Sequence, residues 1–223
     1  MPTVRRLVVA VLLAVLCLCG TARAQGAGEA HDSDFSLGFR FDVVGADGEP
    51  TNDMLGASVA GRYRLNDRWW LGMAFDHSPE FDSERPYESL GLVGAASAGE
   101  VDALATANAV TAWIERVYAR PGRLEWFWGL GGGLAVVDVE DVAGPLEGGG
   151  GTYDISQDVG TELLAGASGG LRVRLGARWA FETALRLDQH FTDWTITDRV
   201  SGRTVKLDDY LVKGGHFGLV FRF

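Results

Sequence analysis

Residues 216–223 read HFGLVFRF and alternate strictly between two kinds of side chain. One face of this stretch contains only large apolar residues, namely Phe217, Leu219, Phe221 and Phe223. A repeat of two is the repeat of a β-strand, because successive side chains of a strand point to opposite sides of its sheet. The stretch therefore predicts a strand with one fully apolar face.

The same alternation recurs along most of the chain. It is found in residues 35–42, 55–65, 69–76, 126–136, 171–175 and 178–188. Residues 105–119 are also strand-like, but their phase is ambiguous because the adjacent Glu115 and Arg116 cannot share a face. The pattern predicts an all-β fold of eight antiparallel strands, or of ten if residues 87–96 also pair.

Two kinds of connection separate these strands. Short turns are predicted at 66–67, 121–122 and 176–177, where Asn-Asp, Pro-Gly and Gly-Ala pairs occur. The other connections are long and rich in Gly, and together they contain most of the excess negative charge; they span roughly 45–53, 78–103, 138–158 and 192–208. One end of the molecule is thus expected to be compact, and the other to be a mobile, solvated, acidic crown.

The first 24 residues have the pattern of a cleaved secretory signal peptide. Arg5 and Arg6 precede an apolar run over residues 7–19, and Ala22 and Ala24 form an Ala-x-Ala cleavage site. The run is shorter than the roughly 20 residues of a membrane-spanning helix. Lipidation at Cys19 is the alternative, but no small residue precedes that cysteine. We therefore expect residues 1–24 to be removed and residues 25–223 to form one domain.

The composition excludes several classes of function. The 223 residues include 20 Lys+Arg and 30 Asp+Glu, a formal charge of -10, which disfavours nucleic-acid binding because such binding depends on cations that neutralise phosphates. Removal of residues 1–24 takes away three arginines and both cysteines, Cys17 and Cys19. The mature chain then has a charge of -13 and contains neither a disulfide nor a thiolate nucleophile.

The distribution of side chains favours a membrane barrel over a soluble β-sandwich. The polar faces mix charged residues with many Gly, Ala and Ser, as suits a narrow interior in which charges pair across a small lumen. The apolar faces contain tryptophans close to the short turns, namely Trp69, Trp126, Trp128 and Trp179. Such a ring is typical of the aromatic girdle of a transmembrane β-barrel at one bilayer interface.

In these features the chain resembles the small outer-membrane β-barrel proteins of Gram-negative bacteria, the OmpA-like, OmpX-like and OmpW-like group. The most specific motif is the C-terminal assembly signal of that class, which His216, Gly218, Phe221 and Phe223 match. The resemblance implies an eight-stranded up-and-down barrel in the outer membrane. It also implies contacts with membrane lipids and lipopolysaccharide, and with the barrel-assembly machinery and periplasmic chaperones.

An eight-stranded barrel has an interior that side chains can fill. The predicted inward set of charged residues contains both signs in similar measure; it is Arg40, Asp42, Arg62, Arg64, Asp76, Arg172, Arg174, Glu182, Arg186, Asp188 and Arg222. We interpret this set as an ion-paired network that closes the lumen, because an unpaired charge in a confined site is costly. The predicted role is structural or surface-interacting; the alternative is a narrow porin-like channel.

Signals for catalysis and ligand binding are weak. Some barrels of the resembling group are lipid-modifying enzymes, and here His190, followed by Ser201 and Asp208, is the one candidate; no catalytic residue or cofactor is predicted from that spacing. The acidic loop residues Asp138, Glu140, Asp141 and Glu147 are candidate contacts for divalent cations without a regular calcium-loop spacing. The glycines of residues 129–133 are expected to make room for Arg172 or Arg186.

Overall fold

The structure is a computed structural model that describes residues 34–47, 54–85, 101–119, 123–146 and 151–223. The predicted signal peptide, its cleavage residues Ala22 and Ala24, and the candidate strand at 87–96 lie outside the described residues. The part of the chain that the structure describes has no helix long and apolar enough to cross a membrane.

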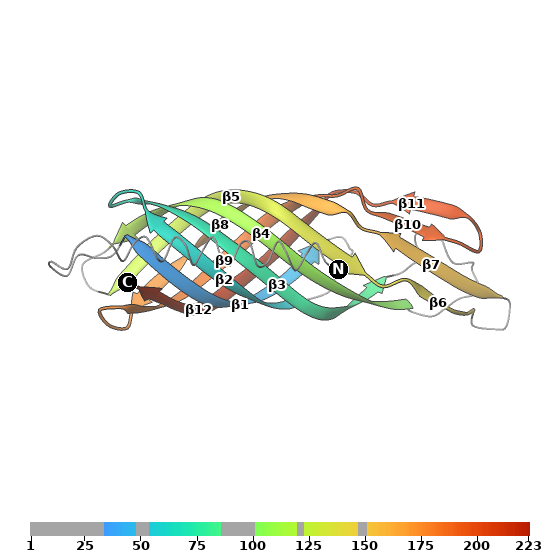
Figure 1. Ribbon diagram of the computed structural model, residues 1–223, viewed down its shortest axis with the longest axis horizontal. Helices are drawn as coiled ribbons and strands as arrows, with labels where there is room; N and C mark the ends of the chain where they lie inside the picture. The colour runs from blue at the N-terminus through green and yellow to red at the C-terminus, as the bar shows by residue number, and fades with distance from the viewer. Residues whose placement is uncertain (1–33, 48–53, 86–100, 120–122, 147–150) are drawn as a thin grey trace.

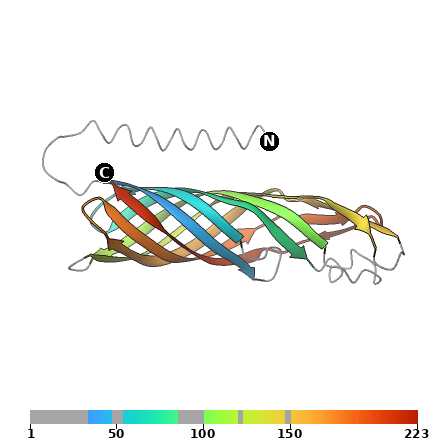
Figure 2. The ribbon, with the colours of Figure 1, turned by 90° about the horizontal axis from the view of Figure 1, so that it is seen from below.

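Eight long antiparallel strands close into a barrel, as Figure 1 and Figure 2 show. They are β1 (Phe35–Asp47), β2 (Met54–Arg64), β3 (Trp69–Arg85), β4 (Val101–Ala119), β5 (Leu124–Val139), β8 (Thr161–Arg174), β9 (Trp179–Phe191) and β12 (Tyr210–Arg222). Each strand pairs with its neighbour in the chain among these eight, and β1 pairs with β12 to close the ring. The predicted eight-stranded fold is confirmed.

The alternation of the sequence separates the barrel wall into two surfaces. Large apolar side chains point outward and are exposed; Leu185 is 75% exposed, Leu55 69% and Phe41 61%. The inward faces instead bury charged side chains such as Arg62 and Glu182. This is the reverse of a soluble sandwich, whose apolar faces are covered, and it is the arrangement of a transmembrane barrel.

The structure also resolves the phase of β4. Glu115 is buried in the lumen, whereas Arg116 points outward, where its guanidinium lies 5.6 Å from the ring centroid of Trp69 and 5.0 Å from that of Tyr118. The long aliphatic stem of an outward arginine lies along apolar surface while its charged end reaches the polar interface. The two adjacent charges therefore occupy opposite faces of one strand.

Four short strands form a second sheet beyond the long-loop end of the barrel, at the right of Figure 1. They are β6 (Val142–Pro145), β7 (Thr152–Asp158), β10 (Thr195–Asp198) and β11 (Arg203–Lys206), in the spatial order β11-β10-β7-β6. We call them the outer sheet. They occupy the connections 138–158 and 192–208, so the expectation of a mobile, solvated crown is wrong for the described parts of these two connections.

The outer sheet is ordered because it has a hydrophobic core of its own. Trp194, Ile155 and Ile196 are completely buried against the inner faces of β4 and β5 where these strands extend beyond the barrel, at Ala105 and Val137. Trp194 is the largest fully buried side chain among the described residues. Apolar residues that lie among the glycines and acids of two distant loops thus meet in one cluster. The spacing of the apolar residues within either loop did not predict this contact.

Ion pairs join the two connections on the surface of the outer sheet. Arg199 Nη2 lies 2.6 Å from Asp141 Oδ2, and Arg199 Nη1 lies 3.2 Å from Asp154 Oδ1. Within the connection 192–208, Lys206 Nζ lies 2.5 Å from Asp193 Oδ1. The backbone N–H of Gln157 donates to Asp141 and, together with Arg199, holds the pKa of Asp141 below its ordinary value.

The outer sheet is therefore expected to loosen in acid before the barrel does. Because the pKa of Asp141 is lowered on folding, the stability that its carboxylate contributes is complete above the ordinary aspartate pKa of about 3.9 and is lost as the pH falls through the lower folded value. The amide resonances of Ile155 and Ile196, followed from about pH 7 to about pH 3, test this order of events. Asp141→Asn should weaken the pH dependence; an unchanged profile would contradict the assignment.

Candidate functional site: the barrel lumen

Glu182, in β9, is the centre of the lumen network. Its carboxylate is completely buried, and it lies 3.0 Å from Arg40 Nη2, 2.5 Å from Arg62 Nη2 and 2.5 Å from Arg172 Nε. His216 Nε2 is 3.0 Å from the same carboxylate. Residues from β1, β2, β8 and β12 therefore converge on one acid, because the inward positions of these strands reach the same height in the barrel.

Glu115 is a second buried carboxylate beside this centre. It pairs with Arg172 Nη2, and its Oε2 lies 3.4 Å from Arg62 Nε. Three guanidinium groups and two carboxylates, with His216, thus form a layer across the lumen that we call the central layer; its members are Arg40, Arg62, Arg172, Glu115, Glu182 and His216. Buried ion pairs of this kind stabilise a site only when the charges remain mutually satisfied.

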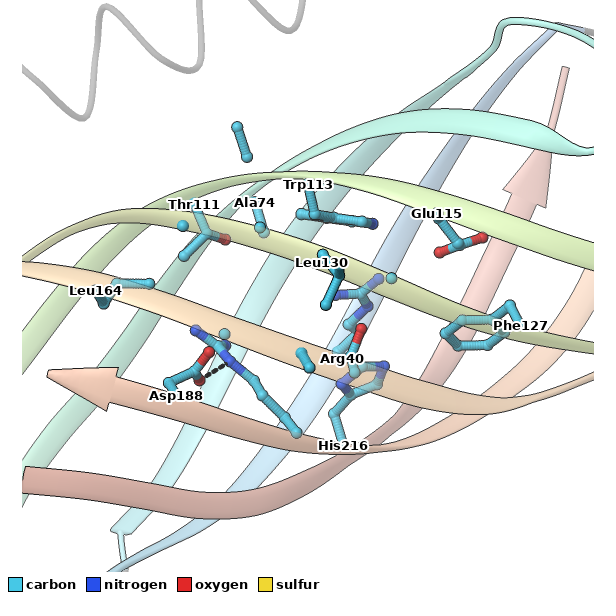
Figure 3. A pocket seen from close by; sticks show the side chains of 18 residues that line it. Arg40, Ala74, Thr111, Trp113, Glu115, Phe127, Leu130, Leu164, Asp188 and His216 are labelled. Carbon is cyan, nitrogen blue, oxygen red and sulfur yellow. Dashed lines mark hydrogen bonds and ion pairs between the residues drawn. The ribbon is translucent and has the colours of Figure 1, made fainter.

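Two aromatic side chains complete the central layer. The guanidinium carbons of Arg40 and Arg62 lie 5.3 Å and 5.8 Å from the ring centroid of Trp113, and that of Arg172 lies 4.1 Å from the Phe127 ring. Figure 3 shows Arg40, Trp113, Glu115, Phe127 and His216 around the same interior space. Aromatic faces attract cations within about 6 Å, so these rings hold the arginines that the two carboxylates do not fully neutralise.

Trp113 fits in the lumen because β3 has glycine opposite it. A Cβ atom at Gly72 would lie 2.3 Å from the Trp113 ring. The glycines of residues 129–133 approach the same strand: a Cβ at Gly131 would lie 2.5 Å from Trp113 Cβ, and one at Gly133 would lie 2.0 Å from the Val110 carbonyl oxygen. The expectation that these glycines make room for Arg172 or Arg186 is wrong, since the nearest atoms belong to β4 at Gly129, Gly131 and Gly133, and to the backbone of β8 at Gly132.

A smaller ion cluster lies at the short-turn end of the lumen. Glu125 accepts from Arg174 and Arg222, with Nη2–Oε distances of 2.7 Å and 2.6 Å. Arg64 belongs to the same rim but pairs with the exposed Asp67 of the neighbouring turn. Of the predicted lumen set, Arg64 is thus the member whose ion pair lies outside the lumen.

Toward the long-loop end the lumen becomes acidic. Arg186 pairs with Asp188 and, at 3.3 Å, with Asp76. Asp42 is also buried at this level. Three carboxylates therefore surround one guanidinium in the outer half, whereas guanidinium groups outnumber carboxylates in the central layer.

His190 does not meet the other members of the catalytic set considered from the sequence. Its Nδ1 lies 2.8 Å from Glu162 Oε2, which also accepts from the Tyr210 hydroxyl at 2.8 Å. Ser201 instead donates to Asp198 at 2.6 Å, on the outer sheet, and Asp208 lies beyond the end of β11. The hydroxyl and the imidazole are therefore not brought together as a nucleophile and its base.

The acidic loop residues are also separated in the described part of the chain. Asp141 pairs with Arg199, while Asp138 and Glu140 are exposed; Glu147 lies outside the described residues. Among the residues that the structure describes, no group of three or more His, Cys, Asp or Glu side chains is arranged to hold a metal ion.

The tryptophans predicted as a girdle lie on the outside of the short-turn end. Trp69 contacts Trp128 with ring centroids 5.9 Å apart, Trp126 stacks on Tyr118 at 4.1 Å, and Trp179 contacts Phe221 at 4.9 Å. Phe221 in turn contacts Phe223 at 5.0 Å. Aromatic side chains of β3, β5, β9 and β12 therefore line the same rim.

Gly218 lies at the seam where the last strand meets the first. A Cβ atom there would lie 2.0 Å from the Phe39 carbonyl oxygen and 2.8 Å from Arg40 Cα. His216, two residues earlier, points into the lumen toward Glu182, and Phe221 and Phe223 lie on the outside. Each residue of the predicted assembly motif thus also has a structural position in the closed barrel.

Replacing Gly218 by valine is expected to impair closure of the barrel. The side chain would push β12 away from β1, a strain of about 1–3 kcal/mol or more for an overpacked site. Gly169→Val is the matched control, because a Cβ there meets its nearest atom at an ordinary 3.6 Å. The fraction that refolds to an SDS-resistant form measures the effect; equal refolding of both variants would refute the close approach at the seam.

Comparisons with known proteins agree with this architecture. No protein-family model matches the sequence, and no curated protein matches it. Two solved structures have a similar fold. Neisserial surface protein A superposes with a TM-score of 0.56 and 11% sequence identity, and the match covers 86% of this chain and 98% of that protein. The outer membrane protein OprG from Pseudomonas aeruginosa superposes with a TM-score of 0.57 and 11% identity, and the match covers 85% of this chain and 95% of that protein. The chain has the fold of the eight-stranded outer-membrane β-barrels.

Sequence reasoning about this outer-membrane barrel fold missed four lumen residues, namely Trp113, Glu115, Glu125 and Glu162. Trp113 and Glu115 were missed because the phase of β4 was ambiguous. Glu125 and Glu162 lie at the ends of β5 and β8, and extending the alternation back from Phe127 and from Arg172 would have placed both inward. The alternation therefore includes both residues, but the strands predicted from the sequence were too short to reach them.

Proposed function

We propose that this protein is an integral protein of the outer membrane whose role is structural or surface-interacting, with a lumen that its own side chains close. The observation that carries the proposal is the central layer, in which Glu115 and Glu182 are at most 1% exposed and bind three arginines across the interior. A solute crossing the lumen would have to break these ion pairs, at a cost of several kcal/mol.

The outer surface supports insertion into a bilayer. Large apolar side chains such as Leu163 and Phe217 are exposed around the wall, and a contiguous surface of that kind is not stable in water. A closed barrel leaves no unpaired strand edge for lipid to face. On this proposal the short-turn end faces the periplasm, the wall contacts outer-membrane lipids and lipopolysaccharide, and periplasmic chaperones and the barrel-assembly machinery deliver the chain.

The outer sheet supports a role at the cell surface. Its buried core and its ion pairs hold two connections in one ordered layer at the end opposite to the short turns. An ordered surface pays less entropy on binding a partner than a mobile loop does.

The absence of enzymatic activity is part of the proposal. His190 is engaged by Glu162 and stacks on Tyr210 with ring centroids 4.9 Å apart. Expression of the protein should therefore leave the phospholipid and lipid A profile of the host membrane unchanged. A new lipid product that disappears in His190→Ala would overturn this part of the proposal.

Two measurements test the membrane role and the closed lumen separately. Refolded protein on an SDS gel should migrate differently before and after boiling, because closed barrels resist SDS until they are heated. Protein that shows no shift and is soluble in plain buffer would refute the membrane barrel.

The refolded barrel should also be electrically silent in a planar bilayer. Stepwise conductance would refute the closed lumen and favour a narrow porin-like channel. The gel shift measured on the same preparation ensures that silence reflects a folded barrel.

A further inference from the structure

We propose that the outer half of the lumen binds a short-chain alkylammonium cation. The site is a cavity of about 80 Å³ between the central layer and the outer sheet. Asp42, Asp76, Asp188 and Arg186 are its acidic and guanidinium groups, and His77 and His190 also line it. Small or branched apolar side chains supply most of its remaining wall. We call it the outer cavity.

The charge of the outer cavity favours a cation. Its three carboxylates face one guanidinium, and Arg186 is already engaged by both Asp76 and Asp188. The nearby Glu162, which has an Oε1 without a hydrogen-bond partner, adds a further buried carboxylate. One positive ligand group would bring this part of the lumen closer to neutrality.

Asp42 provides the specific contact. Its side chain is 8% exposed and lines the outer cavity, and its Oδ2 atom has no hydrogen-bond partner. A buried carboxylate oxygen without a donor is costly. An ammonium group supplies such a donor with a positive charge, and charge-assisted hydrogen bonds are the stronger kind.

The walls favour an organic cation over a metal ion. Ala107, Ala109, Val137, Leu164 and Val212 line the outer cavity. Divalent ions such as Ca²⁺ require a shell of oxygen ligands, and no group of three or more His, Cys, Asp or Glu side chains among the described residues is arranged to hold a metal ion. An alkyl chain a few carbons long, in contrast, gains free energy by leaving water for such a wall.

The central layer makes the outer cavity a binding site and not a passage. Arg186 lines both the outer cavity and the adjoining cavity of about 50 Å³, and Arg40 of the central layer lines the adjoining cavity alone. In the same layer, Arg62 and Arg172 are held in place by the buried glutamates. A cation that enters from the long-loop side therefore meets an electropositive floor.

The test is a titration of the full barrel in zwitterionic lipid nanodiscs with n-butylammonium. Methyl resonances of Val44, Val137 and Val212, which line the outer cavity, report binding at this place and not on the surface. We expect saturable shifts of these methyl groups. 1-Butanol, which has the same chain without the charge, should bind at least about tenfold more weakly.

Two variants distinguish the contribution of the Asp42 charge to binding from that of the cavity volume. Asp42→Asn should weaken butylammonium binding at least about tenfold without loss of the SDS-resistant fold, because it removes the negative charge of a carboxylate whose Oδ2 has no hydrogen-bond partner to lose. Ala109→Leu should abolish binding by filling the cavity, whatever the charge. Asp67→Asn, at the exposed turn of the other end, should bind as the wild type does.

Several results would overturn the proposal. These are the absence of saturation in the folded wild-type barrel, unchanged affinity in Asp42→Asn, and equal affinity for 1-butanol. Tighter binding of Ca²⁺ with the same methyl shifts would instead identify a divalent-cation site.

Discussion

Replacing Glu182 by glutamine is expected to lower the free energy of unfolding by about 3–5 kcal/mol. The substitution keeps the size of the side chain but removes the negative charge shared by Arg40, Arg62 and Arg172. In this variant Glu115 would still contact Arg62 and Arg172, but Arg40 would have no counter-ion in the central layer. Breaking a buried ion pair from one side costs more than the pair contributes, because the remaining charge stays desolvated.

Urea unfolding of the barrel in lipid vesicles, followed by tryptophan fluorescence, measures this loss. Asp67→Asn is the matched control, because it removes one partner of the exposed Arg64–Asp67 pair, and exposed pairs contribute about 0–1 kcal/mol. A loss of less than about 1 kcal/mol in Glu182→Gln would show that the arginines do not depend on this carboxylate.

Replacing Trp194 by alanine is expected to unfold the outer sheet and leave the barrel intact. Trp194 is completely buried among Ile155, Ile196, Val137 and Ala105. Truncating a buried tryptophan to alanine costs about 3–5 kcal/mol, which is much of what so small a core can supply. The eight barrel strands have their own pairing and share only the ends of β4 and β5 with this cluster.

Amide hydrogen exchange resolves the two parts of the molecule. Protection of β7 and β10 should fall at least about a hundredfold in Trp194→Ala, while protection in β9 and β12 and the heat-dependent gel shift stay as in the wild type. Val200→Ala, at a 59% exposed position in the turn between β10 and β11, is the control and should change little. Uniform loss of protection along the whole chain would contradict an independent outer core.

The barrel itself was predictable because its information is local. In β9, the alternation of Phe181 and Leu185 with Glu182 and Arg186 assigns each residue to the outside or the inside without reference to any other strand. The same rule placed Asp42 and Arg172 in the lumen. It did not indicate that Arg64, at the rim, pairs with Asp67 of the neighbouring turn. At β4 it left two phases open, because Glu115 and Arg116 are adjacent.

Ion-pair partners and the outer sheet were not predictable from such a pattern. The contact between Arg62 and Glu182 spans 120 positions in the sequence and depends on how far neighbouring strands are shifted around the ring. The cluster around Trp194 joins the connection after β5 to the one after β9. The sequence of either connection does not predict that it packs against the other, because the apolar residues of both lack a regular spacing.

The sequence by itself determined a two-faced strand architecture, because the side-chain period of two acts at every residue regardless of its partners. Only the tertiary structure decided which charges meet in the lumen and which loop residues bury one another. Those choices depend on strand register and barrel closure, which bring distant inward positions to the same height. A single strand is enough to decide which side chains face outward and which face inward. The central layer and the hydrophobic cluster around Trp194 form only when the strands and loops are brought together in the closed barrel.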